Sequence, residues 1–246
     1  MSVKDHFSRQ SAGYQQFRPH YPPALAAYLA DVAPGRALAL DVATGNGQAA
    51  VDLAGHFERV LASDISENQL KHRTRHPRVE YLRHPAERQP LKAGVADLLA
   101  VAQSAHWFDF ARFYPEARRV LRPGGVVALW TYALLRIDAA TDAIIDRFYR
   151  ERVGRFWPPE RRLVEQEYRT LPFPLEELRA PAFAIDASFT LEALINYVGT
   201  WSAVDRCRHQ TGIDPLPELA LELKPGWSRD ERRPARWPLH LRIGRV

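Results

Sequence analysis

The chain has 246 residues with 46% hydrophobic and 26% charged content, which is ordinary for one soluble globular domain with embellishments. No window approaches the roughly 18 apolar residues of a membrane span, and the opening MSVKDHFSRQ lacks the apolar run of a secretory signal, so we expect a cytoplasmic enzyme with no membrane partner. One cysteine, Cys207, excludes an intramolecular disulfide, and Cys207 with His209 is too few ligands for zinc, so no metal is expected.

The net charge of +5 raises the possibility of nucleic-acid binding. The most basic stretch, KHRTRHPR at 71–78, has no aromatic residues between its charges, as stacking on single strands would prefer. A solvated helix end and loop is the simpler interpretation, so no nucleic-acid partner is expected.

Strands and helices alternate in the first half of the chain. Apolar or alternating runs predict strands, and amphipathic runs between them predict helices, one of which starts at Ser66 as a good N-cap. The predicted strands are 37–42, 59–64, 79–84, 96–103 and 126–132, the predicted helices are 47–57, 66–73 and 109–121, and RPGG at 122–125 is a predicted turn. This alternation indicates a parallel sheet with helices on both faces, whose carboxyl edge collects any ligand.

The pattern changes after residue 135. A helix is expected over 137–153, followed by a proline-rich irregular insertion at 155–181 in which Trp157 is a candidate cover of a substrate. A strand over 182–189 and a helix over 190–210 come next, with Thr190 as the cap. The alternating tail, ARWPLHLRIGRV, suits a last, edge strand.

The loop DVATGNGQ, 41–48, follows the first predicted strand. The dinucleotide fingerprint G-x-G-x-x-G fails at Ala43 and Gln48, and Asp41 would repel a pyrophosphate. An acid here favours a ligand with a cationic amine, while the glycines allow close approach of backbone. Asp64, at the end of the second predicted strand, can accept hydrogen bonds from a ribose. S-adenosylmethionine, which becomes S-adenosylhomocysteine on transfer, fits both acids.

At this point the chain resembles a known family. DVATGNGQ is followed in order by ASDIS (62–66), PAERQPL (85–91), QSAHWFD (103–109) and RVLRPGG (119–125), which are similar to the motifs of class I S-adenosylmethionine-dependent methyltransferases. FSRQSAGYQQFRPHYP (7–22), GTWSA (199–203) and the ending WPLHLRIGRV resemble the small-molecule branch that includes trans-aconitate methyltransferase-like proteins. The resemblance implies an α/β fold, a Rossmann-like seven-stranded and mostly parallel sheet with its last strand antiparallel and inserted near the edge.

The resemblance also implies site residues. An N-terminal lid would bring Tyr14 or Arg18 near the carboxylate of the cofactor. Ala43 stands where the family usually has glycine, and alanine fits there if its φ is negative. The implied cofactor-binding residues are Tyr14, Arg18, Asp41, Ala43, Thr44, Gly45, Asn46, Gly47, Gln48, Asp64, Ile65, Ser66, Ala86, Glu87, Gln103 and Ser104. The implied substrate residues are Phe7, Tyr21, His106, Trp107, Tyr132 and Trp201, of which Trp107 and Trp201 could instead be packing residues.

The expected organisation has four parts: a lid segment at 1–35, a cofactor-binding core at 36–135, an insertion over the substrate at 136–181, and a strand–helix–strand unit at 182–246. The expected reaction is methyl transfer to a small molecule, at a carboxylate or hydroxyl oxygen, with His106 as the candidate catalytic residue if a general base is needed. Four alternatives remain: a nucleic-acid or protein methyltransferase, a nicotinamide oxidoreductase, and an inactive cofactor-binding protein of the same fold. The oligomeric state is not predicted.

Overall fold

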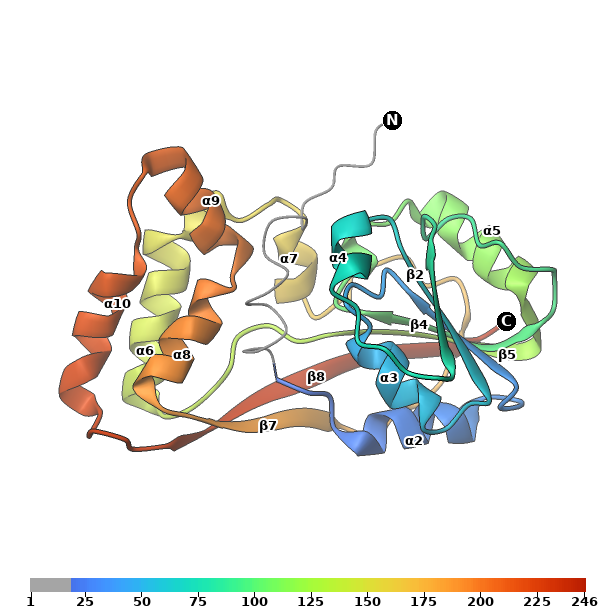
Figure 1. The fold of residues 1–246 in the computed structure, drawn as a ribbon, viewed down its shortest axis with the longest axis horizontal. Helices are drawn as coiled ribbons and strands as arrows, with labels where there is room; N and C mark the ends of the chain where they lie inside the picture. Colours follow the sequence, from blue (N-terminus) through green and yellow to red (C-terminus); the bar gives the residue numbers. More distant parts are fainter. Residues whose placement is uncertain (1–18) are drawn as a thin grey trace.

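The computed structural model describes residues 19–246. Phe7, Tyr14 and Arg18, the predicted lid residues, lie outside these residues. Figure 1 shows two groups of helices joined by two long strands: helices α2, α3, α4 and α5 accompany the sheet, and α6, α8, α9 and α10 gather at the other end of the molecule. Within residues 19–246, no helix is both long enough and apolar enough to cross a membrane.

The central sheet has the order β3-β2-β1-β4-β5-β8-β6, and β7 pairs with β8 beyond this path. Strands β1 to β5 are parallel to their neighbours, whereas β8 is antiparallel to β5. The fold predicted from the sequence is thereby confirmed. The strands are β1 Leu38–Val42, β2 Arg59–Asp64, β3 Val79–Arg83, β4 Ala96–Ala102, β5 Leu121–Thr131, β6 Glu176–Glu177, β7 Phe183–Phe189 and β8 Arg233–Arg245.

Strand β8 is not the edge strand that its alternating pattern indicates. Its second half lies between β5 and β6, while its first half pairs with β7. Alternation of buried and exposed side chains holds over 235–239, where one face packs on the core, whereas Ile243 and Gly244 of the inserted half are both buried. The predicted turn at 122–125 lies inside β5, as an irregularity in its pairing with β4.

The helices largely follow the sequence pattern, and Ser66 and Thr190 are confirmed as N-caps. The helix expected over 190–210 is broken at Thr200 and Trp201, because the extended backbone of Trp201 places its side chain in the core. Three helices, α2, α7 and α10, were not predicted, and α7 lies in the insertion expected to be irregular. The helices are α2 Pro23–Val32, α3 Gln48–Ala54, α4 Glu67–Lys71, α5 Phe110–Val120, α6 Ala139–Arg147, α7 Arg161–Glu165, α8 Leu191–Gly199, α9 Ser202–Thr211 and α10 Leu216–Leu223.

Side chains on the two faces of the sheet form two cores. Alternate strand residues such as Ala39 and Leu98 pack with α2 and α3, and this core continues into the distant helical group through Trp201 and Trp237. The intervening residues, such as Leu40 and Leu99, pack with α5. Because both faces are covered, the carboxyl edge of the parallel strands is where polar groups can gather.

The joint between the sheet and the distant helices is tested by Trp237→Ala. Trp237 is fully buried on β8, donates from Nε1 to the Tyr197 hydroxyl at 3.0 Å, and contacts the rings of Tyr132 and Phe189. We expect a loss of about 3–5 kcal/mol in the free energy of unfolding, measured by urea denaturation. Leu221→Ala, at an exposed position, is the control and should change stability by less than about 0.5 kcal/mol. A loss below about 1 kcal/mol for Trp237→Ala would contradict the assignment of Trp237 to the joint between the sheet and the distant helices.

Candidate active site

The loop after β1 turns through three residues with left-handed backbone. Ala43, Gly45 and Gly47 have φ angles of 56°, 59° and 88°. The expectation of a negative φ at Ala43 is therefore wrong, because the Thr44 amide reaches back to the Ser63 carbonyl at 2.9 Å and the chain must turn sharply to do so. A left-handed conformation is costly for alanine but not for glycine, so this loop holds backbone strain at its first position.

The two glycines are needed for different reasons. Gly47 is the N-cap of α3, and a Cβ there would overlap the hydroxyl of Tyr81, which donates to the Thr74 carbonyl at 2.6 Å. Gly45 has open space around it, so only its positive φ selects glycine. The glycines therefore allow the left-handed turn and the close approach of Tyr81.

Asp41 lies at the end of β1 and is fully buried. Burial raises its pKa to about 7, against the lowering effect of the Thr44 hydroxyl and the Ala50 amide, and the nearby negative charge of Asp64 adds to the rise. Its Oδ2 accepts a hydrogen bond from Thr44, whereas Oδ1 makes no hydrogen bond of normal geometry with residues 19–246. A buried carboxyl with an unsatisfied oxygen is a site that a cationic group would stabilise.

Asp64 connects the loops that follow β1 and β2. Its Oδ2 accepts from the Gly45 amide and its Oδ1 from the Ser66 amide, both at 2.8 Å. A carboxylate at the end of β2 is the kind of acceptor that a ribose hydroxyl can use. Ile65, which follows Asp64 in the chain, is half-buried. Ser66 caps α4, because its side chain accepts a hydrogen bond from the Gln69 amide at 3.3 Å.

The other predicted cofactor residues lie around these two loops. Asn46 is buried. The side-chain nitrogen of Gln48 donates to the Pro19 carbonyl at 2.8 Å, which brings the first described residues over α3. Ala86 is buried, and Glu87 accepts from the Asp109 amide at 3.0 Å. These contacts hold the segments in place.

Gln103 and Ser104 follow β4 and reach its two neighbouring strands. Gln103 has a φ of 59°, and its side chain donates to the Tyr132 carbonyl at 3.1 Å and accepts from the Thr131 hydroxyl at 2.5 Å, so its amide braces the end of β5. The Ser104 hydroxyl lies 3.3 Å from the Ala43 carbonyl. The strained turns after β1 and β4 are thereby in direct contact.

His106 lies in the short 3₁₀ helix η1, Ala105–Trp107, directly beyond β4. Burial, with the positive charge of Arg161, lowers the pKa of His106 to about 3, so the imidazole is neutral at physiological pH. Its Nδ1 lies 2.8 Å from the hydroxyl of Tyr168, and its ring lies 4.8 Å from that of Trp107. A base with this pKa holds a proton weakly, which favours a role in contact and orientation over proton abstraction.

Tyr168 is the site residue that the sequence pattern did not indicate. It is fully buried, and it and Glu167 both have left-handed backbone, with φ angles of 60° and 59°. This turn directs the Tyr168 hydroxyl to His106, 62 residues earlier in the chain. The turn lies in the insertion predicted as irregular, where no periodicity marks a buried side chain.

The remaining predicted substrate residues are mostly in the core. Tyr21 places its ring edge-on to Trp130 with 5.5 Å between centroids. Tyr132 contacts Trp237, and Trp201 is 4% exposed among Tyr149, Trp157 and Tyr197. For Trp201 this placement favours the packing alternative.

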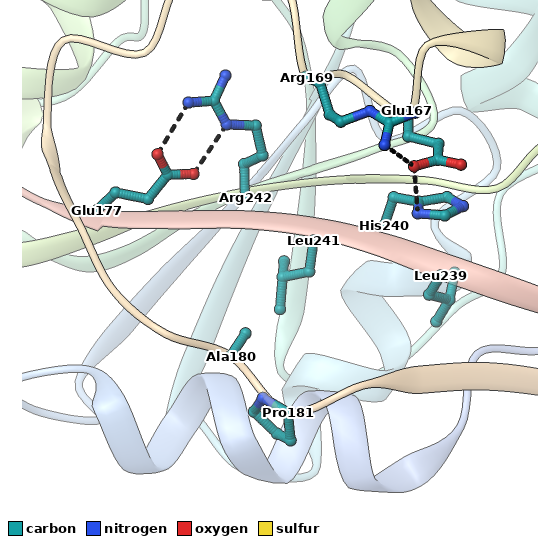
Figure 2. A pocket seen from close by; sticks show the side chains of 9 residues that line it. All are labelled: Glu167, Arg169, Glu177, Ala180, Pro181, Leu239, His240, Leu241 and Arg242. Atoms are coloured by element: carbon teal, nitrogen blue, oxygen red, sulfur yellow. Dashed lines mark hydrogen bonds and ion pairs between the residues drawn. The ribbon is translucent and has the colours of Figure 1, made fainter.

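A separate open cavity of about 490 Å³ lies beside the break between β6 and β7 (Figure 2). Its charged side chains are paired with one another: Arg242 with Glu177 at 2.9 and 3.0 Å, and Arg169 with Glu167 at 3.3 Å. Arg242 also donates to the Tyr168 carbonyl at 3.3 Å. The cavity contains none of the predicted site residues, and its ion pairs support the turn that carries Tyr168.

Comparisons with known proteins agree on one family. Residues 40–129 match the methyltransferase domain family. A candidate methyltransferase of Dictyostelium discoideum is 33% identical over 219 residues, which cover 87% of this chain and 83% of the relative. An uncharacterised methyltransferase of Mycobacterium tuberculosis is 33% identical over 198 residues, which cover 80% of this chain and 76% of the relative. A solved structure of a candidate type II methyltransferase from Anaeromyxobacter dehalogenans has 48% identity and a TM-score of 0.87, with 93% of this chain and 98% of that chain covered.

Strain at Ala43 predicts a stabilising substitution. Ala43→Gly removes the cost of about 1–2 kcal/mol for a left-handed alanine, offset in part by the greater freedom of glycine when unfolded. We expect the free energy of unfolding in urea to rise by about 0.5–1 kcal/mol. Ala140→Gly, at an exposed position of α6, is the matched control and should lower stability by a similar amount. Equal losses in both variants would show that Ala43 carries no strain.

The raised pKa of Asp41 predicts a pH-dependent stability. Its pKa of about 7 in the folded state lies above the unfolded value of 3.8, so between pH 4 and 7 the folded state holds a proton that the unfolded state lacks. The Asp41 contribution to stability therefore falls as pH rises through this range. We expect Asp41→Asn to be more stable than the natural chain at pH 8 by about 1–3 kcal/mol, and much less so at pH 5, in urea denaturation. A pH-independent difference, or a destabilised variant at pH 8, would contradict the prediction.

Proposed function

We propose a methyl acceptor for this chain, which belongs to the S-adenosylmethionine-dependent methyltransferases. The proposed acceptor is a carboxylate or hydroxyl oxygen of a small molecule. The observation that carries the cofactor part is the loop of Ala43, Gly45 and Gly47, held between the buried acids Asp41 and Asp64. The resemblance to the trans-aconitate methyltransferase-like branch stays a prediction.

The described residues fit the cofactor at three points. The unsatisfied Oδ1 of Asp41 suits the cationic amine of the methionine part, and the glycine backbone leaves room beside it. The Asp64 carboxylate, at the end of β2, suits the two ribose hydroxyls as a hydrogen-bond acceptor. Ile65 and Ala86 are apolar residues in the segments beside the expected adenine position.

When bound, S-adenosylmethionine would supply an activated methyl group to the acceptor oxygen, and S-adenosylhomocysteine would be left. The protein then has to orient the acceptor and exclude water. A carboxylate acceptor carries no proton to remove, which agrees with the low pKa of His106. His106 is thus proposed to contact the acceptor.

A small-molecule acceptor is favoured over a nucleic acid by what the basic stretch 71–78 does in the fold. Arg73 donates to the Leu70 carbonyl at 2.8 Å and lies over the ring of Tyr81, and Arg78 donates to the Ala54 carbonyl at 3.4 Å. These arginines are engaged in local contacts instead of forming a free cationic strip. The long insertion near the carboxyl edge also supports an enclosed acceptor.

Calorimetric titration with S-adenosylhomocysteine tests the cofactor site. The natural chain should bind, and Asp64→Ala should weaken binding about 10- to 100-fold, because two hydrogen bonds to the ribose are lost. Asp186→Ala, an exposed acid on β7, is the matched control and should bind normally. Thermal unfolding of each variant verifies that Asp64→Ala is folded, since Asp64 also holds two backbone amides. No binding by the natural chain, or equal binding by both variants, would refute the cofactor assignment.

A further inference from the structure

The open cavity at the break between β6 and β7 runs along one side of β8. Four consecutive residues of this strand, 239–242, line it. Consecutive side chains of a strand point to opposite faces of the sheet, and Figure 2 shows His240 and Arg242 on one side of β8 and Leu241 on the other. A cavity that reaches side chains of both faces lies beside the strand, where the backbone N–H and C=O groups are presented.

The backbone of Leu241 faces this cavity. In an antiparallel sheet, successive residues of a strand direct their N–H and C=O groups to alternate neighbours. The amide of Val246 donates to the Gly125 carbonyl of β5 at 3.0 Å, whereas the carbonyl of Ile243 accepts from the Leu178 amide, next to β6, at 2.8 Å. Leu241 comes two residues before Ile243, so its N–H and C=O also point away from β5, into the break.

The chain opposite Leu241 cannot complete the sheet there. Strand β7 pairs Phe183 with Leu239, and the same register would place residue 181 opposite Leu241. Residue 181 is a proline, which has no backbone N–H to donate. Over the described range 19–246, neither β6 nor β7 pairs with Leu241, and no other backbone bond reaches it from this side. One donor and one acceptor of the same residue are thus left beside the cavity.

The charges around the cavity favour a neutral ligand. Arg242 is paired with Glu177, and Arg169 with Glu167, so the positive and negative side chains balance. Burial lowers the pKa of His240, so its ring is neutral at physiological pH. An ion would have to compete with these pairs, whereas a neutral polar molecule would not.

The space beside Leu241 also restricts the kind of amide that can pair with it. An extended peptide would need room along β8, but β7 occupies the position beside Leu239 and Leu178 the position beside Ile243. A single trans amide directs its N–H and C=O in opposite directions, so it could pair with only one of the two Leu241 groups. A cyclic amide is held in the cis form and presents both groups on one edge.

We propose that the cavity beside β8 binds a neutral cyclic amide, a lactam, through the backbone of Leu241. The lactam carbonyl accepts from the Leu241 N–H, and the lactam N–H donates to the Leu241 carbonyl. Ala180 and Pro181 supply apolar contacts across the cavity, whose volume of about 490 Å³ is that of a small-molecule site. The site is separate from the candidate active site and does not depend on the proposed methyl transfer.

The test is an NMR titration that observes the Leu241 amide of the intact protein. His240–Leu241 is the only His–Leu pair in the sequence, so labelling histidine carbonyls with ¹³C and leucine nitrogens with ¹⁵N selects this one amide. The probes are 2-pyridone and uracil, each compared with its N-methylated form, which lacks the N–H donor. At least one lactam should shift the Leu241 signal saturably, and its N-methylated form should bind at least about 10-fold more weakly.

A matched pair of variants places the binding in the cavity. Ala180→Phe fills the cavity from the side opposite Leu241 and should abolish the shift. Ala182→Phe introduces the same ring two residues away, at an exposed position that does not line the cavity, and should leave the affinity unchanged within about twofold. If neither lactam shifts Leu241 saturably, if the N-methylated forms bind equally well, or if a folded Ala180→Phe still binds, the site is wrong. Should Ala180→Phe not fold, the comparison with the N-methylated probes decides.

Discussion

The carboxylate of Asp64 accepts one backbone amide from each of two loops, and the geometry of the candidate site depends on this bridge. Gly45 follows β1 and Ser66 follows β2, so the two hydrogen bonds hold neighbouring strand ends at a fixed spacing. The left-handed turn through Ala43 and Gly47 is held by further backbone hydrogen bonds, from the Thr44 amide to the Ser63 carbonyl at 2.9 Å and from the Gly47 amide to the Thr44 carbonyl at 3.0 Å. A carboxylate thereby lies at the point where two parallel strands end.

The same edge combines features that cost stability. Asp41 is buried with one unsatisfied oxygen, and Ala43, Gln103, Glu167 and Tyr168 all have left-handed backbone without being glycine. Such features persist where the surrounding structure enforces them, and they cluster where a ligand is to be bound. Here the surrounding structure is the covered parallel sheet, whose two cores hold β1 and β4 rigidly. The candidate site is therefore preorganised, and a ligand is expected to pair with the Asp41 oxygen that the chain leaves unsatisfied.

The sequence patterns predicted the strands and helices that have a regular pattern of apolar residues, together with the residues at their ends. The runs that became β1, β2 and β4 are continuous and apolar, and the acids after the first two follow from where the pattern stops. The position of β8 could not be predicted this way, because half of it alternates like an exposed strand while the other half lies inside the sheet. The positive φ of Ala43 could not be predicted either, because alanine gives no local signal for a left-handed turn.

The part of the site proposed to hold the methyl acceptor was harder to predict from the sequence, for a related reason. Tyr168 meets His106, and Arg161 stacks on Trp157, through an insertion whose chain path has no periodicity. These contacts depend on tertiary placement, while the cofactor loop depends on local turns. The proposed cofactor site and the proposed acceptor site therefore depend on different kinds of structure at one edge of the sheet.

The most direct measurement is a crystal structure of the protein with S-adenosylhomocysteine. The account predicts both ribose hydroxyls on Asp64, the amino group directed to Asp41, and the sulfur facing the His106 side of the loop. A ligand bound elsewhere, such as in the cavity between β6 and β7, or one whose ribose avoids Asp64, would contradict it.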